Sequence, residues 1–227
     1  MATAVGWFPV AGGMIGAAVG GIGAAAWYGV PPLLAGTLAV AAGLLITGAF
    51  HEDGLGDVAD AFGGGWTVER RLEILKDSRH GTYGVAAICT SIAVRMVALG
   101  SMPGPAALFA SAVAAHAISR ASAVGLMASM RLATHPGLGT DYGRSTSPRV
   151  GVVAGASGVA IAAVAVGWWA LPLAVSGVAS AALIGALAQR KISGVSGDVL
   201  GACQQVAECA GLVVLCGLAA RHQLSWR

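Results

Sequence analysis

Charge is scarce in this sequence. Only 10% of its 227 residues are charged, whereas an ordinary soluble domain carries about 25%. The first fifty residues, Met1 to Phe50, contain neither a charged residue nor a histidine. A chain with so few charges cannot cover a globular surface in water. Its mean hydropathy of +0.77 therefore indicates that lipid is its natural solvent.

Other deficits exclude further classes of protein. The formal net charge is only +3 and no long basic run is present, so we expect no nucleic-acid partner. No positively charged stretch precedes the first apolar run, so we expect no signal peptide. The cysteines form no C-x-x-C pair and lie in apolar segments, where we expect free thiols that pack as small hydrophobes. They are Cys89, Cys203, Cys209 and Cys216.

Long apolar windows dominate what remains. Seven windows approach the roughly 20 residues that a helix needs to cross a bilayer. We therefore predict an all-α, polytopic integral membrane protein with about seven transmembrane helices, forming a single domain over residues 1–227. In the first window, Gly12, Gly16 and Gly20 predict a close helix–helix contact. The windows run approximately from Trp7 to Trp27, Leu33 to Phe50, Tyr83 to Met102, Ala106 to Ala128, Val150 to Trp169, Leu171 to Ala188 and Val199 to Ala220.

The connections between the windows alternate in charge. Connections 51–82, 129–149 and 190–198 hold most of the basic residues, whereas the proline-containing turns between them are uncharged. The positive-inside rule makes the charged side cytoplasmic. We therefore expect a multi-pass membrane protein whose site faces the cytoplasm. We expect the protein to contact the lipid bilayer, and its sequence is compatible with a homo-oligomer.

One acidic stretch stands out, His51 to Asp60, and seven of the ten acidic residues lie between Glu52 and Asp77. If the second window continues as a helix, the spacing i, i+4, i+7 places Asp53, Asp57 and Asp60 on one face. Carboxylates so close together repel one another unless a cation sits among them. An all-oxygen set suits Mg²⁺, which typically bridges carboxylates to a substrate phosphate.

Two neighbours of these carboxylates fall outside that face. His51 points to the opposite side, where it is available to a loop or a substrate, and we leave Glu52 out of the site. The alternative interpretation of the whole stretch is a solvated acidic cap on a helix end.

A second charged motif follows in the segment 67–79. Val68, Leu72 and Leu75 predict a short amphipathic cytoplasmic helix along the membrane surface. Lys76 and Arg79 at its end are suited to a phosphate or diphosphate. Asp77 would add a metal ligand or orient Arg79. The alternative is a contact between this basic segment and lipid headgroups.

A third motif lies before and within the last window. Gly194 and Gly197 allow close backbone approach to a ligand. Asp198 and Glu208 lie on a broad shared face of the last helix, and we expect both to join the first acidic site. We interpret the acids of the sequence as clustered at helix ends on one side, and we expect no acid near the centre of a window.

Three ionisable residues lie inside apolar windows, where such groups are functional candidates. Arg120 is placed to reach an anionic ligand, or else to hydrogen-bond a neighbouring helix. For His116 and Arg95 we expect helix-to-helix hydrogen bonding.

These motifs in combination resemble the cobalamin synthase family, the adenosylcobinamide-GDP ribazoletransferases. The matching runs are His51-Glu52-Asp53-Gly54-Leu55-x-Asp57-x-x-Asp60, then Leu72-Glu73-Ile74-Leu75-Lys76-Asp77-Ser78-Arg79-x-Gly81-x-x-Gly84, then Gly194 to Ala202. The resemblance covers almost the whole chain. The sequence departs from the family pattern at Glu52, Leu75 and Ser196, where the family usually has Leu, Met and Thr.

The resemblance implies a multi-pass, Mg²⁺-dependent transferase of the bacterial cell (inner) membrane that acts in the vitamin B12 pathway. A hydroxyl of α-ribazole, or of its 5′-phosphate, would attack the cobinamide-bound phosphorus of adenosylcobinamide-GDP and release GMP. Residues and resemblance together give the following expectations. Catalytic residues are His51, Asp53, Asp57, Asp60, Lys76 and Asp77; metal ligands are Asp53, Asp57, Asp60 and Asp198; substrate-binding residues are Ser78, Arg79, Gly81, Arg120, Gly194, Gly197, Asp198 and Glu208.

Two other functions compete with this one. CDP-alcohol phosphotransferases also carry an aspartate array on a helix, but they need Ala-Arg shortly after Asp-Gly, where this chain has Leu55-Gly56-Asp57. A cation transporter would place its carboxylates near the bilayer midplane, whereas the carboxylates of this sequence are expected at helix ends.

Overall fold

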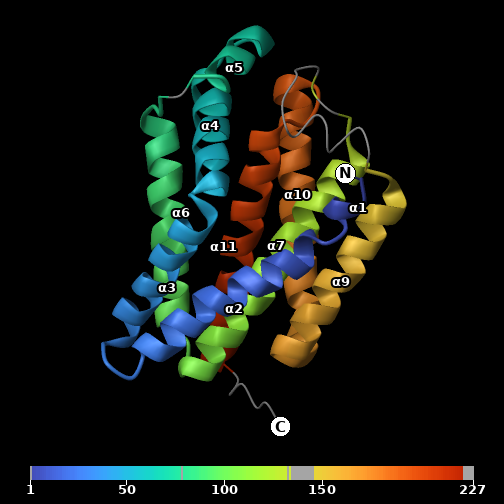
Figure 1. The fold of residues 1–227 in the computed structure, drawn as a ribbon. Helices are drawn as coiled ribbons and strands as arrows, with labels where there is room; N and C mark the ends of the chain where they lie inside the picture. Colours follow the sequence, from blue (N-terminus) through green and yellow to red (C-terminus); the bar gives the residue numbers. More distant parts are fainter. Residues whose placement is uncertain (1, 78, 132, 134–145, 222–227) are drawn as a thin grey trace.

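The described part of the chain is helical throughout. Figure 1 shows the computed structural model, which describes residues 2–77, 79–131, 133 and 146–221; no β-strand occurs among them. The helices are α1 (Ala2–Val5), α2 (Phe8–Ala26), α3 (Pro32–Thr47), α4 (Phe50–Gly64), α5 (Val68–Ile74), α6 (Thr82–Gly100), α7 (Pro105–Ser129), α9 (Pro148–Val166), the 3-10 turn η1 (Gly167–Trp169), α10 (Ala170–Ile192) and α11 (Gly197–Arg221).

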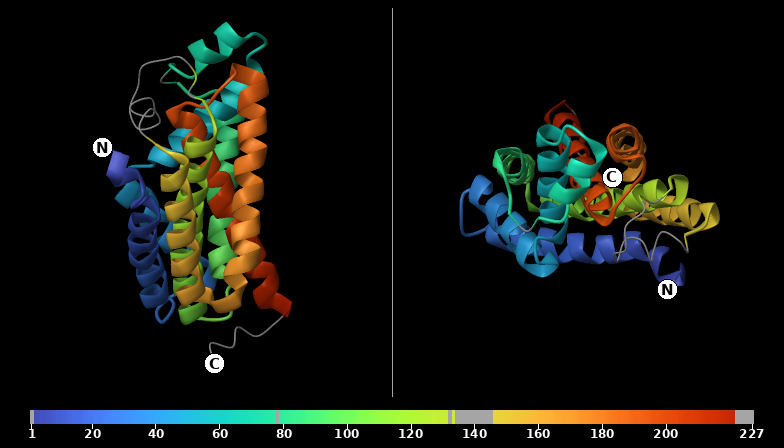
Figure 2. Two further views of the ribbon diagram at one scale, coloured as in Figure 1. Left: turned by 90° about the vertical axis from the view of Figure 1, so that its right-hand side faces the viewer. Right: turned by 90° about the horizontal axis from the view of Figure 1, so that it is seen from above.

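Most of these helices suit a bilayer. Five helical segments of the described residues are long and apolar enough to cross a membrane, and six if α3 and α4 together make one bent span. One segment is the 45-residue stretch Pro148–Ile192, in which α9 and α10 run side by side in opposite directions (Figure 2). The predicted all-α polytopic fold is confirmed. The predicted count of about seven spans is approximate.

The second apolar window ends in a sharp bend instead of continuing straight into the acidic stretch. Gly48 caps α3 with φ +64° and donates its N–H to the carbonyl of Leu44, as left-handed glycine caps commonly do. Ala49 is also left-handed, with φ +55°. As a result, α4 leaves α3 at an angle of 90°. The acidic motif therefore lies on a helix of its own.

Glycines set how closely the long helices approach. A Cβ added at Gly16 would lie 2.6 Å from the carbonyl oxygen of Ala112, and one at Gly20 would lie 2.8 Å from that of Phe109. At Gly12 the added atom would collide with the carbonyl oxygen of His116. The predicted contact face is confirmed: α2 packs backbone to backbone against α7, as small residues permit within membranes.

Helix α7 forms the centre of the bundle and is buried along most of its length. It contacts α2, α9, α10 and α11. The amphipathic segment after α4 is shorter than expected, because α5 spans only Val68–Ile74. The apolar side chains Leu72 and Leu75 are partly buried and pack against a core cluster that includes Val199. The position of this segment along the membrane surface stays a prediction.

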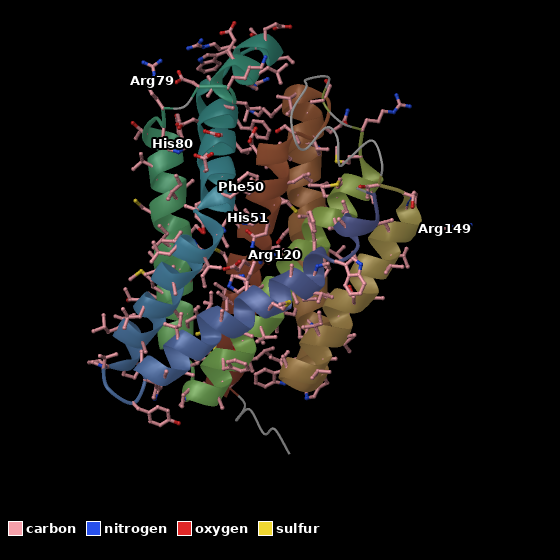
Figure 3. The ribbon with its side chains drawn as sticks, viewed as in Figure 1. Phe50, His51, Arg79, His80, Arg120 and Arg149 are labelled. Carbon is pink, nitrogen blue, oxygen red and sulfur yellow. The ribbon has the colours of Figure 1, made fainter. Side chains whose placement is uncertain are left out.

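Charge gathers at one end of the bundle. The upper end of the bundle in Figure 1 contains α5, the C-terminal ends of α4, α7 and α10, and the N-terminal ends of α6 and α11. Arg79 also lies at this end (Figure 3). The alternation of charged and uncharged connections predicted this common end, and it brings the three charged motifs together.

Candidate active site

Two aspartates of α4 and one histidine form a compact group at this end. His80 Nε2 lies 3.3 Å from Asp53 Oδ1, and His80 Nδ1 lies 3.5 Å from Asp57 Oδ1. Asp53 and Asp57 are four residues apart, so they share a face of α4. The Asp53 side chain is 66% exposed and that of Asp57 only 13%. The group therefore has one solvent-facing carboxylate and one sheltered carboxylate, joined by an imidazole.

His80 is held there by the junction between α4 and α6. One oxygen of Asp60 accepts the Gly81 N–H at 2.6 Å and the other accepts the Gly84 N–H at 2.9 Å. These are the donors that the first turn of a helix leaves without partners. Gly56 makes room for the ring, because an added Cβ would lie 3.0 Å from His80 Nδ1. Asp60 was expected to bind metal, but in this structure both of its oxygens cap α6.

Asp198 approaches the same group from α11. A Cβ added at Gly54 would lie 3.0 Å from the Cα and from the carbonyl oxygen of Asp198. Gly201 likewise leaves space for the backbone of His51 and Gly54. This close packing brings the carboxylate of Asp198 into electrostatic interaction with those of Asp53 and Asp57. The predicted meeting of the first and third motifs therefore occurs around Asp198.

This arrangement fits a divalent cation. Within the described residues, Asp53, Asp57 and His80 offer one ligand atom each within 4.8 Å of one another. Three mutually repelling carboxylates leave excess negative charge that a cation would neutralise. The imidazole lies between two of the carboxylates, at the position a counter-charge would take.

Sequence reasoning did not include His80 in the site. Its only signal was its position directly after the motif from Lys76 to Arg79 and before Gly81. A lone histidine in a connection does not reveal that it folds back between two aspartates more than twenty residues earlier in the chain.

The second motif lies beside this group and faces solvent. Asp77 accepts hydrogen bonds from Arg79 through both of its oxygens, at 3.0 Å to Nε and 2.8 Å to Nη2. These bonds lower the pKa of Asp77 to about 2 and raise that of Arg79. Lys76 is exposed. The expected role of Asp77 in orienting Arg79 matches this geometry, and Ser78 lies outside the described residues.

The glycine motif before α11 contains Gly194 and Gly197, which lie in different surroundings. A Cβ at Gly194 would lie 2.7 Å from the backbone nitrogen of Ala133. Next to it, Val195 exchanges backbone hydrogen bonds with Arg131 and Ala133. Gly194, expected to approach a ligand, thus approaches the chain after α7. Gly197 begins α11, immediately before Asp198.

Three predicted site residues belong to a different cluster, buried among α4, α6, α7 and α11. Arg120 Nη1 lies 3.0 Å from His116 Nδ1, and Glu208 Oε2 lies 3.2 Å from the same atom. Arg95 Nη1 lies 3.4 Å from Glu208. His51 lines the same small cavity, in the direction of Arg120 (Figure 3). The helix-to-helix bonding expected of His116 and Arg95 is confirmed.

Glu208 corrects one expectation. At a rise of about 1.5 Å per residue, it lies about 15 Å along α11 from Asp198, near the middle of the helix. An acid does therefore lie near the centre of an apolar window. It is tolerated because Arg95, His116 and Gln204 surround it with partners, as buried charges require. In this structure Glu208 and Arg120 belong to this internal cluster and not to the group around Asp53.

The fold and the site define a class: a polytopic membrane protein with an acidic, metal-compatible group at its charged end. Comparison with known proteins identifies the family. A family model described as cobalamin-5-phosphate synthase matches residues 1–216. The chain belongs to this family.

Curated relatives agree with that assignment. The chain is 40% identical to a protein of Ralstonia nicotianae, over 92% of this chain and 82% of the relative. It is 41% identical to one of Bradyrhizobium diazoefficiens, over 91% and 80%, and 36% identical to one of Shewanella frigidimarina, over 82% and 73%. Each relative is named adenosylcobinamide-GDP ribazoletransferase. No solved structure matches the chain. Family membership makes the chain a transferase-type enzyme of cobalamin biosynthesis.

Proposed function

We propose that this chain is an adenosylcobinamide-GDP ribazoletransferase, built as one membrane-embedded domain. A hydroxyl oxygen of α-ribazole, or of its 5′-phosphate, forms a bond to the cobinamide-bound phosphorus. The bond from that phosphorus to the bridging oxygen of the diphosphate breaks, and GMP leaves with the electron pair. The hydroxyl proton passes to a carboxylate of the site. The observation that carries this proposal is the group of Asp53, Asp57 and His80 at the charged end of the bundle.

The metal of this reaction is proposed to be Mg²⁺. Asp53 and Asp57 would hold it, with Asp198 as the third oxygen donor, because Mg²⁺ prefers oxygen ligands and keeps several waters. When bound, the ion neutralises negative charge on the diphosphate. Asp60 is proposed to position the site through α6, since both of its oxygens are already engaged by backbone N–H groups.

The basic residues beside the acids are proposed to hold the substrate. Lys76 and Arg79 are exposed next to the group and offer cationic donors for phosphate oxygens. Ser78 and Gly81 complete this segment. We propose that this end faces the cytoplasm of the bacterial inner membrane, because basic residues gather in the connections on that side.

The internal cluster is proposed to support the site without touching substrate. His51 lines the internal cavity together with Arg120, so its part in catalysis would be to fix the start of α4. Glu208 and Arg120 would act in the same way, through the packing of α7 and α11 against α4. Gly194 and Gly197 would shape the connection that presents Asp198.

An assay in isolated membranes tests this function. Membranes that contain the wild-type chain should convert adenosylcobinamide-GDP and α-ribazole to adenosylcobalamin only when Mg²⁺ is present. Asp57→Asn should abolish turnover, whereas Glu69→Gln, on exposed α5, should leave it unchanged. A CDP-alcohol serves as the control substrate. Absence of product from the wild type would contradict the function, and full activity in the presence of chelator would contradict the metal.

The two competing functions gain no support from the fold. The sequence after Asp53-Gly54 still lacks the Ala-Arg pair of CDP-alcohol phosphotransferases. A transport site would need an available carboxylate near the midplane, and the buried Glu208 is already matched by Arg95 and His116.

A further inference from the structure

A cleft adjoins the acidic group at the bend between α3 and α4. It encloses about 480 Å³, within the range of about 300–1,000 Å³ typical of small-ligand sites. The left-handed backbone of Gly48 and Ala49 turns α4 away from α3, and α6 closes the other side. The lining residues are Leu44, Gly48, Ala49, Phe50, Glu52, Asp53, His80, Ile88 and Ile92.

The two ends of this cleft differ in chemistry. Asp53 and His80 lie at one end, continuous with the metal-compatible group. Leu44, Ile88 and Ile92 give the other end an aliphatic wall. The other acid of the lining, Glu52, is already paired with Arg95 at 2.8 Å. Glu52 is itself buried, so the apolar end presents mainly aliphatic side chains to a ligand.

An aromatic ring also borders the cleft. Phe50 is 62% exposed and stands edge-on to His51, with the ring centroids 5.5 Å apart. The large face that Phe50 keeps free is suited to stacking on a flat ring. The cleft thus combines an aliphatic wall, an aromatic border and two groups able to bond hydroxyls.

We propose that this cleft binds the acceptor nucleoside, with its dimethylated benzimidazole base against the aliphatic wall and its ribose hydroxyls toward Asp53 and His80. This inference rests on the proposed function and names the subsite of one of its two substrates. Guanine fits less well, because its polar edge would lose water without finding partners. A corrin ring with its amide side chains is too large for the volume. The base therefore enters at the bend between α3 and α4, and the corrinoid diphosphate approaches from the side of Lys76 and Arg79.

Filling the apolar end tests the assignment. Ile92→Trp should raise the KM for α-ribazole at least about tenfold. The KM for adenosylcobinamide-GDP, and kcat at saturating α-ribazole, should stay unchanged. Val97→Trp is the matched control: it lies on the same helix, is 54% exposed and does not line the cleft, so it should change neither KM.

A second variant covers the case in which the large side chain prevents insertion into the membrane. Ile92→Ala removes part of the wall and should raise the KM for α-ribazole several-fold, whereas Val97→Ala should not. An unchanged KM for α-ribazole in an active Ile92 variant, as expected if lipid fills the cleft, would overturn the subsite alone. A raised KM for the corrinoid would also overturn it. Absence of product from the wild type would instead overturn the proposed function and the subsite with it.

Discussion

Arg95 of α6 and Glu52 of α4 form a buried ion pair, with Nη2 and Oε1 only 2.8 Å apart. Both side chains are only 5% exposed. Gln205 of α11 donates to the same Glu52 oxygen at 3.0 Å. Glu52 directly precedes Asp53, so these contacts fix the first turn of α4, on which the acidic group is built. Glu52, which helical geometry places off the aspartate face, therefore stabilises the helix that carries the site.

Breaking this pair is expected to destabilise the protein. Arg95→Met leaves the buried carboxylates of Glu52 and Glu208 short of a counter-charge, which typically costs about 3–5 kcal/mol. For a chain of this size that corresponds to a fall in Tm of about 6 °C or more, measured by thermal unfolding in detergent. The control is Arg70→Ala, which removes an ion pair with Glu73 whose side chains are both 64% exposed. That loss should cost less than about 1 kcal/mol. Equal shifts in the two variants would show that the buried pair contributes no more than a surface pair.

Removing Asp60 is expected to loosen the start of α6. Asp60→Ala takes away the acceptor of two backbone N–H groups and should cost about 1–2 kcal/mol. Hydrogen exchange at the amides of Gly81 and Gly84 should accelerate about tenfold, while Asp60→Asn, which keeps one carbonyl oxygen, should show a smaller effect. If hydrogen exchange in Asp60→Ala is unchanged, and its metal affinity falls as much as in Asp57→Asn, then Asp60 is a metal ligand and not a cap of α6.

The contact between α4 and α11 is expected to tolerate no side chain at Gly54. Gly54→Ala would set a Cβ 3.0 Å from the backbone of Asp198, which cannot rotate away. The helices must separate, so kcat should fall by roughly tenfold or more. Gly155→Ala is the control, because nothing lies within 4 Å of its added Cβ. If both variants keep full activity, the distance between α4 and Asp198 does not matter for the reaction.

The ion pair at the exposed edge of the site predicts a pH dependence. The pKa of Asp77 is lowered from its ordinary value of 3.8 to about 2 by its hydrogen bonds to Arg79. Because this pKa is depressed, the pair is fully present above pH 3.8 and is lost as the pH falls through about 2. Carbon NMR of the Asp77 carboxyl group measures this midpoint. In Arg79→Ala the midpoint should rise toward 3.8, and an unchanged midpoint would show that the pair does not form in solution.

The sequence predicted those features that depend on local order. The apolar windows, the glycine face of α2 and the separation of charged from uncharged connections all follow from residue types at short spacing, and each reappears in the structure. The pairing of Asp53 with Asp57 also follows from local order, because helical periodicity brings residues four apart onto one face.

Contacts between distant parts of the chain were decided only by the tertiary structure. Asp60 meets Gly81 from 21 residues away, and Gln205 meets Glu52 from 153 residues away. Sequence spacing carries no information about such approaches, so His80 was missed. The bend at Gly48 and Ala49 belongs with these contacts. Two left-handed residues inside an apolar run give no clear sequence signal, yet they turn α4 by 90° and open the cleft beside the acids.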